Sequence, residues 1–316
     1  MPADGGHYVN EILVVGSVAL DAVETPFDRS EEVLGGSAVY FSSAASLFAP
    51  VQLCGVVGED YPMDRLDFLR ARGVDLAGLE RRQGRSFRWA GVYNYDLSAR
   101  ETLSTELGVF ADFEPVIPRD YRSSRWVFLG NIDPVLQLRV LDQVQRPDLV
   151  VCDTMNYWIE GALDALLEVL ERIDMLVVND AEARELSGDH NLARAARWIQ
   201  AHGPRHVAIK KGEHGAVLVS GDEIFFCPGY PLEDVFDPTG AGDAFAGGLL
   251  GYLAGTGLTQ PEDLRRAVVY GCALGSFACE AFGPRRLADV RMAEVEARVA
   301  SFHRMTRFET AAVVEG

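Results

Sequence analysis

Along most of the chain, short apolar runs alternate with longer segments in which apolar residues recur with helical periodicity. The short runs predict strands of a parallel sheet, because such strands are covered on both faces and carry no polar side. These runs are Ile12–Gly16, Val51–Gly58, Arg125–Gly130, Leu149–Asp153, Met175–Asn179 and His206–Lys210.

The segments between these runs are amphipathic, and three further helices are predicted in the C-terminal third, after a hairpin at Ala216–Cys227. Strand–helix alternation implies right-handed crossovers, so we expect an α/β fold with a mainly parallel central sheet flanked by helices on both faces. No repeat or linker interrupts the pattern, and residues 1–316 are expected to form a single domain. The predicted helices are Met63–Arg72, Val135–Gln145, Glu160–Arg172, Ala181–Ser187, Leu192–His202, Gly242–Gly255, Pro261–Ala281 and Asp289–Phe302.

Two stretches depart from this pattern. Ala22–Leu34 is polar, and Ser86–Leu107 alternates apolar and polar positions without helical periodicity. Alternation with a period of two predicts strands with one exposed face. We therefore expect a small β lid over the main sheet, formed by about residues 22–36 and 86–107.

Composition and charge narrow the range of partners. The chain is 48% apolar and 24% charged, which is enough for a packed core. Its 29 basic and 47 acidic residues give a net charge of −18, so its surface repels phosphate backbones and no nucleic-acid partner is expected. The longest uncharged stretch, Ala244–Pro261, holds five glycines, which argues against a membrane span. The five cysteines form no C-x-x-C pair, which is typical of reduced thiols, and we expect a cytoplasmic protein.

The sharpest motif is Asp237-Pro-Thr-Gly-Ala-Gly-Asp243, directly ahead of a predicted helix. Glycines at this point let backbone N–H groups converge on an anion at the positive end of the helix dipole. A carboxylate beside a bound phosphate repels it. Its presence there makes sense if it accepts the proton of a hydroxyl that attacks the phosphorus. Asp237 or Asp243 alone would indicate a simple capping turn. The whole motif favours phosphoryl transfer.

This motif resembles the C-terminal signature D-[TP]-T-G-A-G-D of the ribokinase-like (PfkB-type) carbohydrate and nucleoside kinases, and it fits at every position. The likeness runs from Val14 to about Gly283. It implies the ribokinase-like fold and the use of ATP and Mg²⁺. It further implies that Asp243 is the catalytic base, that an anion hole is formed by the amides of Gly240, Ala241 and Gly242, and that a monovalent cation such as K⁺ could lie near Asp237 and Thr239.

The N-terminal half carries the residues expected to bind the acceptor. Asp21 lies just past the first predicted strand, where ligands bind in open α/β sheets, and the resemblance assigns it to substrate hydroxyls. Gly35 and Gly36 resemble the turn at which the backbone approaches the sugar. Tyr40 stands where sugar kinases of the family typically have Asn, and it could either stack on the acceptor or pack in the core.

Two segments are expected to bind the nucleotide. Asn179 and Glu182 resemble the N-x-x-E motif that positions Mg²⁺ through water, although Asn179 could also be a simple N-cap. Lys210–Gly215 corresponds to a turn beneath ATP with glycines at Gly212 and Gly215. Lys210 could contact phosphate, although the family commonly has an uncharged residue there. The chain has only one other lysine, its neighbour at 211.

The resulting hypothesis is an ATP-dependent phosphotransferase that phosphorylates a hydroxymethyl group of a sugar or sugar-like small molecule. A nucleoside kinase of the same family is the first alternative, favoured by Tyr40 and by the aromatic residues of the lid, which are Phe87, Trp89, Tyr93 and Tyr95. A non-catalytic ligand-binding module is the second. A nicotinamide oxidoreductase is disfavoured because no G-x-G-x-x-G follows the first strand. The resemblance also implies a homodimer formed through the lid, because exposed lid strands often pair across a dimer in that family, where an open sheet edge seeks a partner.

Overall fold

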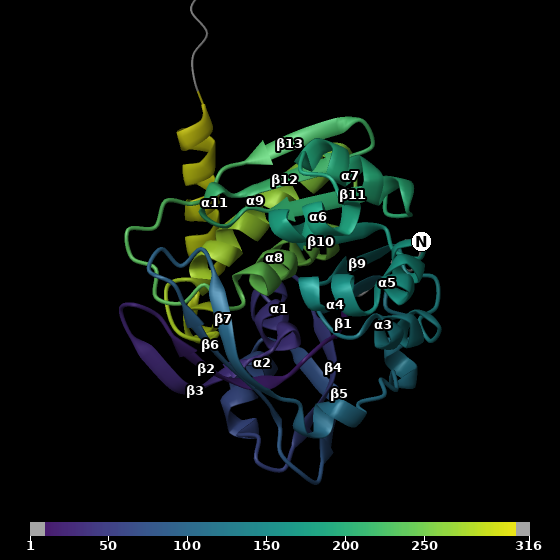
Figure 1. The fold of residues 1–316 in the computed structure, drawn as a ribbon, viewed down its shortest axis with the longest axis vertical. Helices are drawn as coiled ribbons and strands as arrows, with labels where there is room; N and C mark the ends of the chain where they lie inside the picture. The colour runs from purple at the N-terminus through teal and green to yellow at the C-terminus, as the bar shows by residue number, and fades with distance from the viewer. Residues whose placement is uncertain (1–9, 308–316) are drawn as a thin grey trace, which may run out of the picture.

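The computed structural model describes residues 10–307. They form two sheets flanked by helices (Figure 1), and the larger sheet has nine strands in the order β13-β12-β11-β10-β9-β8-β1-β4-β5. Neighbouring strands are parallel except for the pairs β11–β12 and β12–β13, which form the antiparallel end of the sheet. The strands are β1 (Ile12–Val15), β4 (Val51–Gly58), β5 (Val74–Arg82), β8 (Trp126–Leu129), β9 (Leu149–Asp153), β10 (Met175–Asn179), β11 (His206–Lys210), β12 (Ala216–Ser220) and β13 (Glu223–Cys227).

Helices cover both faces of this sheet, and each face has its own apolar core. In β1, Ile12 and Val14 point into one core and Leu13 and Val15 into the other, which explains why the strand is apolar throughout. The first core lies under α1 (Ser37–Ala45), α2 (Asp67–Ala71), α8 (Ala241–Thr256), α9 (Pro261–Ala278), α10 (Arg285–Asp289) and α11 (Met292–Thr306). The second lies under α3 (Pro134–Leu141), α4 (Asn156–Gly161), α5 (Leu163–Leu170), α6 (Asp180–Ser187) and α7 (Leu192–Ala201).

The strand order reverses at β1, which lies between β8 and β4. In open parallel sheets, ligands bind beyond the carboxyl ends of the strands near such a reversal. The carboxyl ends of β1 and of β8 to β11 all lie along this one edge, because these strands are parallel neighbours.

The second sheet has four strands in the order β3-β2-β6-β7 and lies at the lower left of Figure 1. This small sheet is formed largely by residues 22–36 and 86–107, the two stretches without helical periodicity that were expected to form a lid. Val23, Val33 and Tyr93 of the small sheet pack with Phe282 from the C-terminal part of the chain, so they share a small apolar cluster. The strands are β2 (Ala19–Glu24), β3 (Arg29–Gly35), β6 (Phe87–Tyr93) and β7 (Arg100–Glu106).

Helix α1, strand β5 and the short helices α4 and α10 were not predicted from the sequence. Helix α1 is buried at all nine positions, so it has no polar face from which helical periodicity could be recognised. Strand β5 forms the edge of the main sheet, and its buried and exposed positions follow no simple alternation. The predicted helix Met63–Arg72 is in fact a 3₁₀ turn, Met63–Leu66, followed by the short α2.

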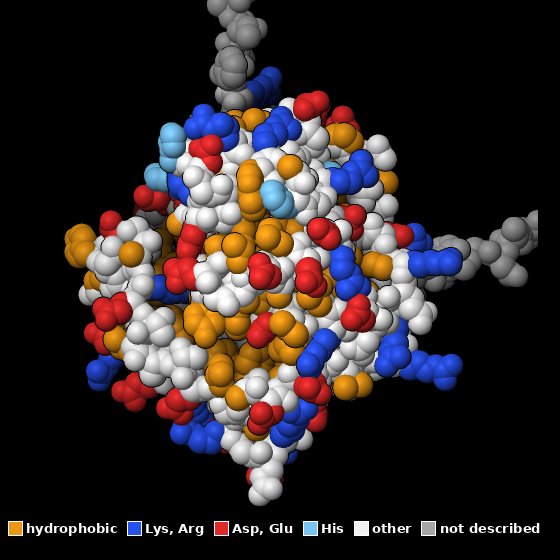
Figure 2. Space-filling view, turned by 45° about the vertical axis from the view of Figure 1, so that its right-hand side comes forward, with side chains coloured by type: hydrophobic (Ala, Val, Ile, Leu, Met, Phe, Trp, Pro, Cys, Tyr) orange, Lys and Arg blue, Asp and Glu red, His pale blue; other side chains and the backbone are white. Residues whose placement is uncertain are grey.

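Basic and acidic side chains lie close together over the surface in Figure 2, around apolar patches on the face turned toward the viewer. The same view shows a hollow toward the left side of the molecule. Within residues 10–307, no helix combines the length and the apolar character needed to cross a membrane.

Candidate active site

Three polar residues end adjacent strands of the main sheet: Asp153 ends β9, Asn179 ends β10 and Lys210 ends β11. Asn179 lies directly opposite Lys210 in the strand register. Helix α8 begins against the same edge, because a Cβ on Gly242 in its first turn would come within 2.9 Å of Lys210 Nζ. The sheet edge and the glycine motif are therefore parts of one site.

The glycine motif forms a tight turn into α8. Gly240 is the N-cap residue, with a left-handed φ of 74°, and the Ala241 N–H donates to the Pro238 carbonyl at 3.2 Å. The first four N–H groups of any helix have no partner within the helix, so the start of α8 offers donors to an anion. The turn could hold an anion in this way, and the anion hole at Gly240–Gly242 stays a prediction; the Ala241 N–H is already bonded to Pro238 in this structure.

Tyr40, on the buried helix α1, packs against this turn. A Cβ on Gly240 would lie 2.3 Å from the Tyr40 ring, whose exposed fraction is 1%. The Tyr40 hydroxyl is also buried and has no hydrogen-bond partner. Burial, followed by the nearby Asp237 and Asp21 carboxylates, raises the pKa of Tyr40, so its hydroxyl stays protonated and able to donate.

Asp243 lies in the first turn of α8, beside the candidate anion hole. Burial and the nearby Asp153 carboxylate raise its pKa to about 7, against the opposing effect of Lys210 and Arg100. A base with a pKa near the working pH combines a sufficient deprotonated fraction with strong basicity. Asp243 is therefore chemically suited to accept a proton from an alcohol.

Lys210 and Asp153 form a buried ion pair behind this turn. The ammonium lies 3.2 Å from both oxygens of the Asp153 carboxylate. Burial alone would lower the pKa of Lys210, but the carboxylates of Asp153, Glu182 and Asp243 raise it, so the ammonium stays charged. Burial raises the pKa of Asp153, and the ammonium opposes that effect.

Asn179 and Glu182 form a capping box at the start of α6. Asn179 Oδ1 accepts the Glu182 N–H at 2.8 Å, and Glu182 Oε2 accepts the Asn179 N–H at 2.7 Å. The N-cap role of Asn179 is thus real, and no hydrogen bond to Glu182 Oε1 is found within residues 10–307. Burial raises the pKa of Glu182 to about 7, against the opposing Lys210 ammonium and with a further contribution from Asp153. After β11 the chain makes the short turn that contains Gly212 and Gly215.

Asp21 and Gly35 are in close contact on the paired strands β2 and β3. A Cβ on Gly35 would come within 1.9 Å of Asp21 Oδ2, so only glycine leaves room for this carboxylate. Gly36 follows as the N-cap of α1. Burial, Asp237 and Asp243 together raise the pKa of Asp21 to about 8, with Arg100 opposing them.

The motif residues Asp237 and Thr239 connect the turn to other parts of the chain. Asp237 is fully buried, and its oxygens accept the N–H groups of Thr239 at 2.8 Å and Gly283 at 3.3 Å. The Thr239 hydroxyl lies 3.0 Å from the Tyr93 hydroxyl of the small sheet. The small sheet is therefore in direct contact with the glycine motif.

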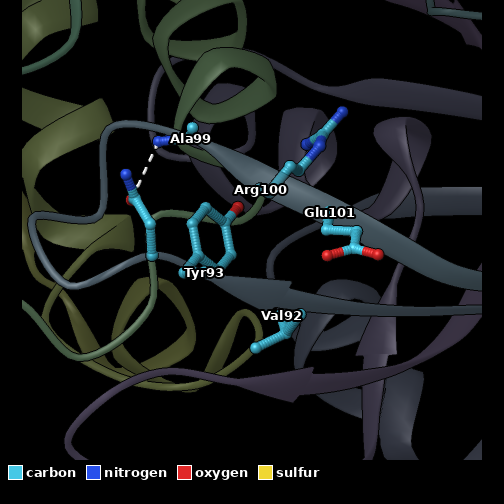
Figure 3. Close-up of a pocket in the computed structure, with 6 residues that line it drawn as sticks. Val92, Tyr93, Ala99, Arg100 and Glu101 are labelled. Atoms are coloured by element: carbon cyan, nitrogen blue, oxygen red, sulfur yellow. Dashed lines mark hydrogen bonds between the residues drawn. The ribbon is translucent and has the colours of Figure 1, made fainter.

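The sequence interpretation missed Arg100 of β7. Arg100 lies opposite Tyr93 in the register of the small sheet, so the two side chains share one face. Figure 3 shows them beside a hollow of about 380 Å³ whose lining residues all come from β6, β7 and their connection. Burial raises the pKa values of Asp21, Asp153 and Asp243, and the positive charge of Arg100 opposes this rise in all three, which indicates that Arg100 lies near the acidic groups of the site. No motif surrounds Arg100, so only the tertiary structure identifies it.

Comparison with known proteins identifies a family for the chain. Residues 10–290 match the pfkB family carbohydrate kinases. The chain is 30% identical over 257 residues to the cytidine kinase of Thermococcus kodakarensis, covering 79% of this chain and 91% of that protein. It is 33% identical over 297 residues to the aminoimidazole riboside kinase of Salmonella typhimurium, covering 87% and 91%. A putative ribokinase II from E. coli, solved in complex with ATP and Mg²⁺, superposes with a TM-score of 0.76 at 21% identity, over 92% of this chain and 99% of that one. Because the family match spans most of its length, the chain belongs to the pfkB family of carbohydrate kinases.

Proposed function

We propose that this protein is an ATP-dependent kinase that phosphorylates the exocyclic hydroxymethyl group of a riboside, meaning a ribose that carries a base or a base precursor. The observation that carries the proposal is the Asp243 carboxylate in the first turn of α8, beside the glycine turn. A riboside acceptor is favoured over a free sugar because both curated relatives described above are named for riboside substrates.

In the proposed reaction, Asp243 takes the proton of the acceptor hydroxyl as that oxygen attacks the γ-phosphorus of ATP. The new O–P bond forms while the bond from phosphorus to the β–γ bridging oxygen breaks, and ADP leaves. The N–H groups at Gly240–Gly242 would stabilise the charge that develops on the transferred phosphoryl group.

The acceptor would lie between the small sheet and the turn, held by Asp21 and the backbone at Gly35 and Gly36. Ribose presents vicinal hydroxyls, for which a buried acid and a free phenol are suitable partners. The Tyr40 hydroxyl is buried and has no hydrogen-bond partner within residues 10–307, so it would donate to the acceptor only after a shift that uncovers it. Its ring is enclosed, which leaves the hydroxyl rather than a stacking face as the group offered.

The nucleotide would lie over Asn179, Glu182, Gly212 and Gly215, with Lys210 near its phosphates. Within the described residues, no three His, Cys, Asp or Glu side chains could hold a metal ion together. Mg²⁺ retains several waters and needs few protein carboxylates, so Glu182 Oε1, to which no hydrogen bond is found within residues 10–307, fits a water-mediated role. When bound, Mg²⁺ would neutralise phosphate charge in a site where acidic groups outnumber Lys210 and Arg100.

Three further points belong to the proposal. K⁺ would lie near Asp237 and Thr239 and would neutralise charge beside the anion hole. The enzyme would act in the cytoplasm, where its five free thiols stay reduced. Homodimerisation through the lid is supported by the apolar side chains exposed on it, which include Phe27, Tyr95 and Leu103.

The test is ATP consumption by the purified protein with Mg²⁺ and a panel of ribosides, pentoses, hexoses and polyols. We expect turnover with at least one riboside and little with free ribose. Turnover with a free sugar alone would replace the riboside assignment by a sugar kinase. Nucleotide binding without turnover of any acceptor would identify a non-catalytic module.

A further inference from the structure

Asp153 and Lys210 form a charged pair that is enclosed to an unusual degree for this protein. The exposed fractions of their side chains are 6% and 18%, and among the ion pairs in the described part of the chain only Arg298 and Glu280, at 11% and 22%, are comparably enclosed. Burying two charges costs desolvation free energy that their attraction often does not recover. A stabilising role alone therefore explains this pair poorly.

Asp153 is held rigidly. Its Oδ1 atom accepts the N–H of Thr154 at 2.9 Å, and its carbonyl accepts a hydrogen bond from Gln137 Nε2 at 3.1 Å. Gln137 is fully buried, and the same nitrogen also donates to the carbonyl of Gly130 at the end of β8. Gln137 thus ties the backbone of Asp153 to the end of β8, and the Thr154 N–H holds the carboxylate.

Lys210 connects this fixed carboxylate to the glycine turn. Its ammonium has three N–H donors, and the two oxygens of Asp153 account for two of them. The side chain lies against Gly242, where a Cβ would be 2.9 Å from Nζ and 3.4 Å from Cδ. One donor therefore remains on an ammonium that lies beside the candidate anion hole.

From this geometry we propose that Asp153 is a positioning residue, which holds the Lys210 ammonium against Gly242 so that the γ-phosphoryl group meets a fixed positive charge as well as backbone amides. The inference rests on the proposed function, because it needs ATP in this site. A lysine side chain is flexible, and Glu182 and Asp243 compete for its charge. Pairing with both oxygens of Asp153 keeps the ammonium beside Gly242.

The proposal predicts in which direction the affinity for ATP changes when the Asp153 carboxylate is removed. A carboxylate that is only a bystander near the phosphate site repels ATP, so its removal would tighten binding. A carboxylate that positions the lysine does the opposite, and its removal weakens binding of the γ-phosphate. ADP lacks that phosphate, so its affinity should change much less.

The experiment is calorimetric titration of the full chain with Mg²⁺ and either a non-hydrolysable ATP analogue or ADP, which needs no acceptor. Lys210→Met should weaken binding of the ATP analogue by about tenfold or more, as expected for the loss of a hydrogen bond to a charged group. It should weaken binding of ADP by less than about threefold. Asp153→Asn should weaken the ATP analogue selectively as well. The double variant should bind like Lys210→Met alone, because Asp153 acts only through the lysine.

The matched control is the exposed pair of Asp142 and Arg172, which lie 2.8 Å apart between α3 and α5. Asp142→Asn and Arg172→Met remove the same charges away from the site and should leave both affinities unchanged. Thermal unfolding checks that each variant folds. If Asp153→Asn does not fold, Asp153→Glu keeps the charge but displaces the ammonium from Gly242, and it should show the same selective loss.

Unchanged or tighter binding of the ATP analogue by Asp153→Asn would overturn the proposal. Equal losses for the ATP analogue and ADP, or additive effects in the double variant, would overturn it too. A wild-type protein that binds neither nucleotide would instead refute the proposed function. A wild-type protein that turns over an acceptor while Asp153→Asn binds the ATP analogue normally would refute this inference alone.

Discussion

The ring of Tyr40 lies directly against Gly240, so that three of its carbon atoms occupy the space within 2.3–2.4 Å of where a Cβ would be. Tyr40 comes from the N-terminal half of the chain and Gly240 from the C-terminal part. Their contact joins the fully buried helix α1 to the turn that begins α8. The shape of the candidate anion hole therefore depends on a residue 200 positions away.

Gly240→Ala should disrupt the anion hole, because the new methyl group would collide with the Tyr40 ring and the left-handed φ of 74° would be strained. We expect a stability loss of about 2 kcal/mol or more in urea unfolding, together with loss of turnover. Gly221→Ala is the matched control, since Gly221 also has a positive φ but no atom within 4 Å of a Cβ. Equal stability of the two variants would show that the contact with Tyr40 is unimportant.

Asp243→Asn should lower kcat by at least about a hundredfold, because the amide cannot accept the hydroxyl proton. The affinity for nucleotide should stay within a few-fold of wild type, and the thermal unfolding temperature should not fall. Asp234→Asn, an exposed acid just upstream of the motif, should behave as wild type. Wild-type turnover by Asp243→Asn would exclude Asp243 as the base.

The pH dependence of kcat/KM should show an acid limb near pH 7, because Asp243 acts only when deprotonated and its pKa is about 7. Arg100→Ala removes a positive charge that favours the deprotonated form, so the limb should move to higher pH. Arg85→Ala removes another lid arginine, one that is exposed and paired with Glu106, and should not move it. A limb at the same pH in Arg100→Ala and wild type would contradict the placement of this charge.

Asp21→Asn should stabilise the protein while impairing acceptor binding. The folded protein holds the Asp21 proton up to about pH 8, whereas an unfolded chain releases it near pH 4, so stability falls as pH rises between these values. Asparagine does not ionise, and at pH 8 we expect a gain of at least about 1.4 kcal/mol, the equivalent of one pKa unit. Urea unfolding at pH 5 and pH 8 measures it. A stability gain at pH 8 no larger than that at pH 5 would contradict the raised pKa of Asp21. In the same variant, KM for the acceptor should rise.

Much of the fold follows from local pattern. Buried parallel strands are apolar throughout because both faces are covered, and this property located β1, β4 and β8 to β11. A period of two indicated the β6–β7 half of the small sheet, whereas the β2–β3 half was recognised only as a polar stretch without helical periodicity. Helix α1 was not, because a helix buried at every position has no polar side. The glycine motif located the turn at Gly240–Gly242 and the neighbouring acid, since a short turn is encoded by consecutive residues.

By itself, the amino-acid sequence determined most of the strand–helix order, the lid stretches and the motif residues from Asp237 to Asp243, because each of these is a pattern among neighbours in the chain. The same local motifs carried the family resemblance. Only the tertiary structure decided that Lys210 pairs with Asp153, that Tyr40 packs against Gly240 and that Arg100 affects the acids of the site. These relations join distant segments, and they depend on strand order, helix placement and the exclusion of water from charged groups. Burial raises the pKa values of Asp21 and Asp243 only after the chain has folded around them.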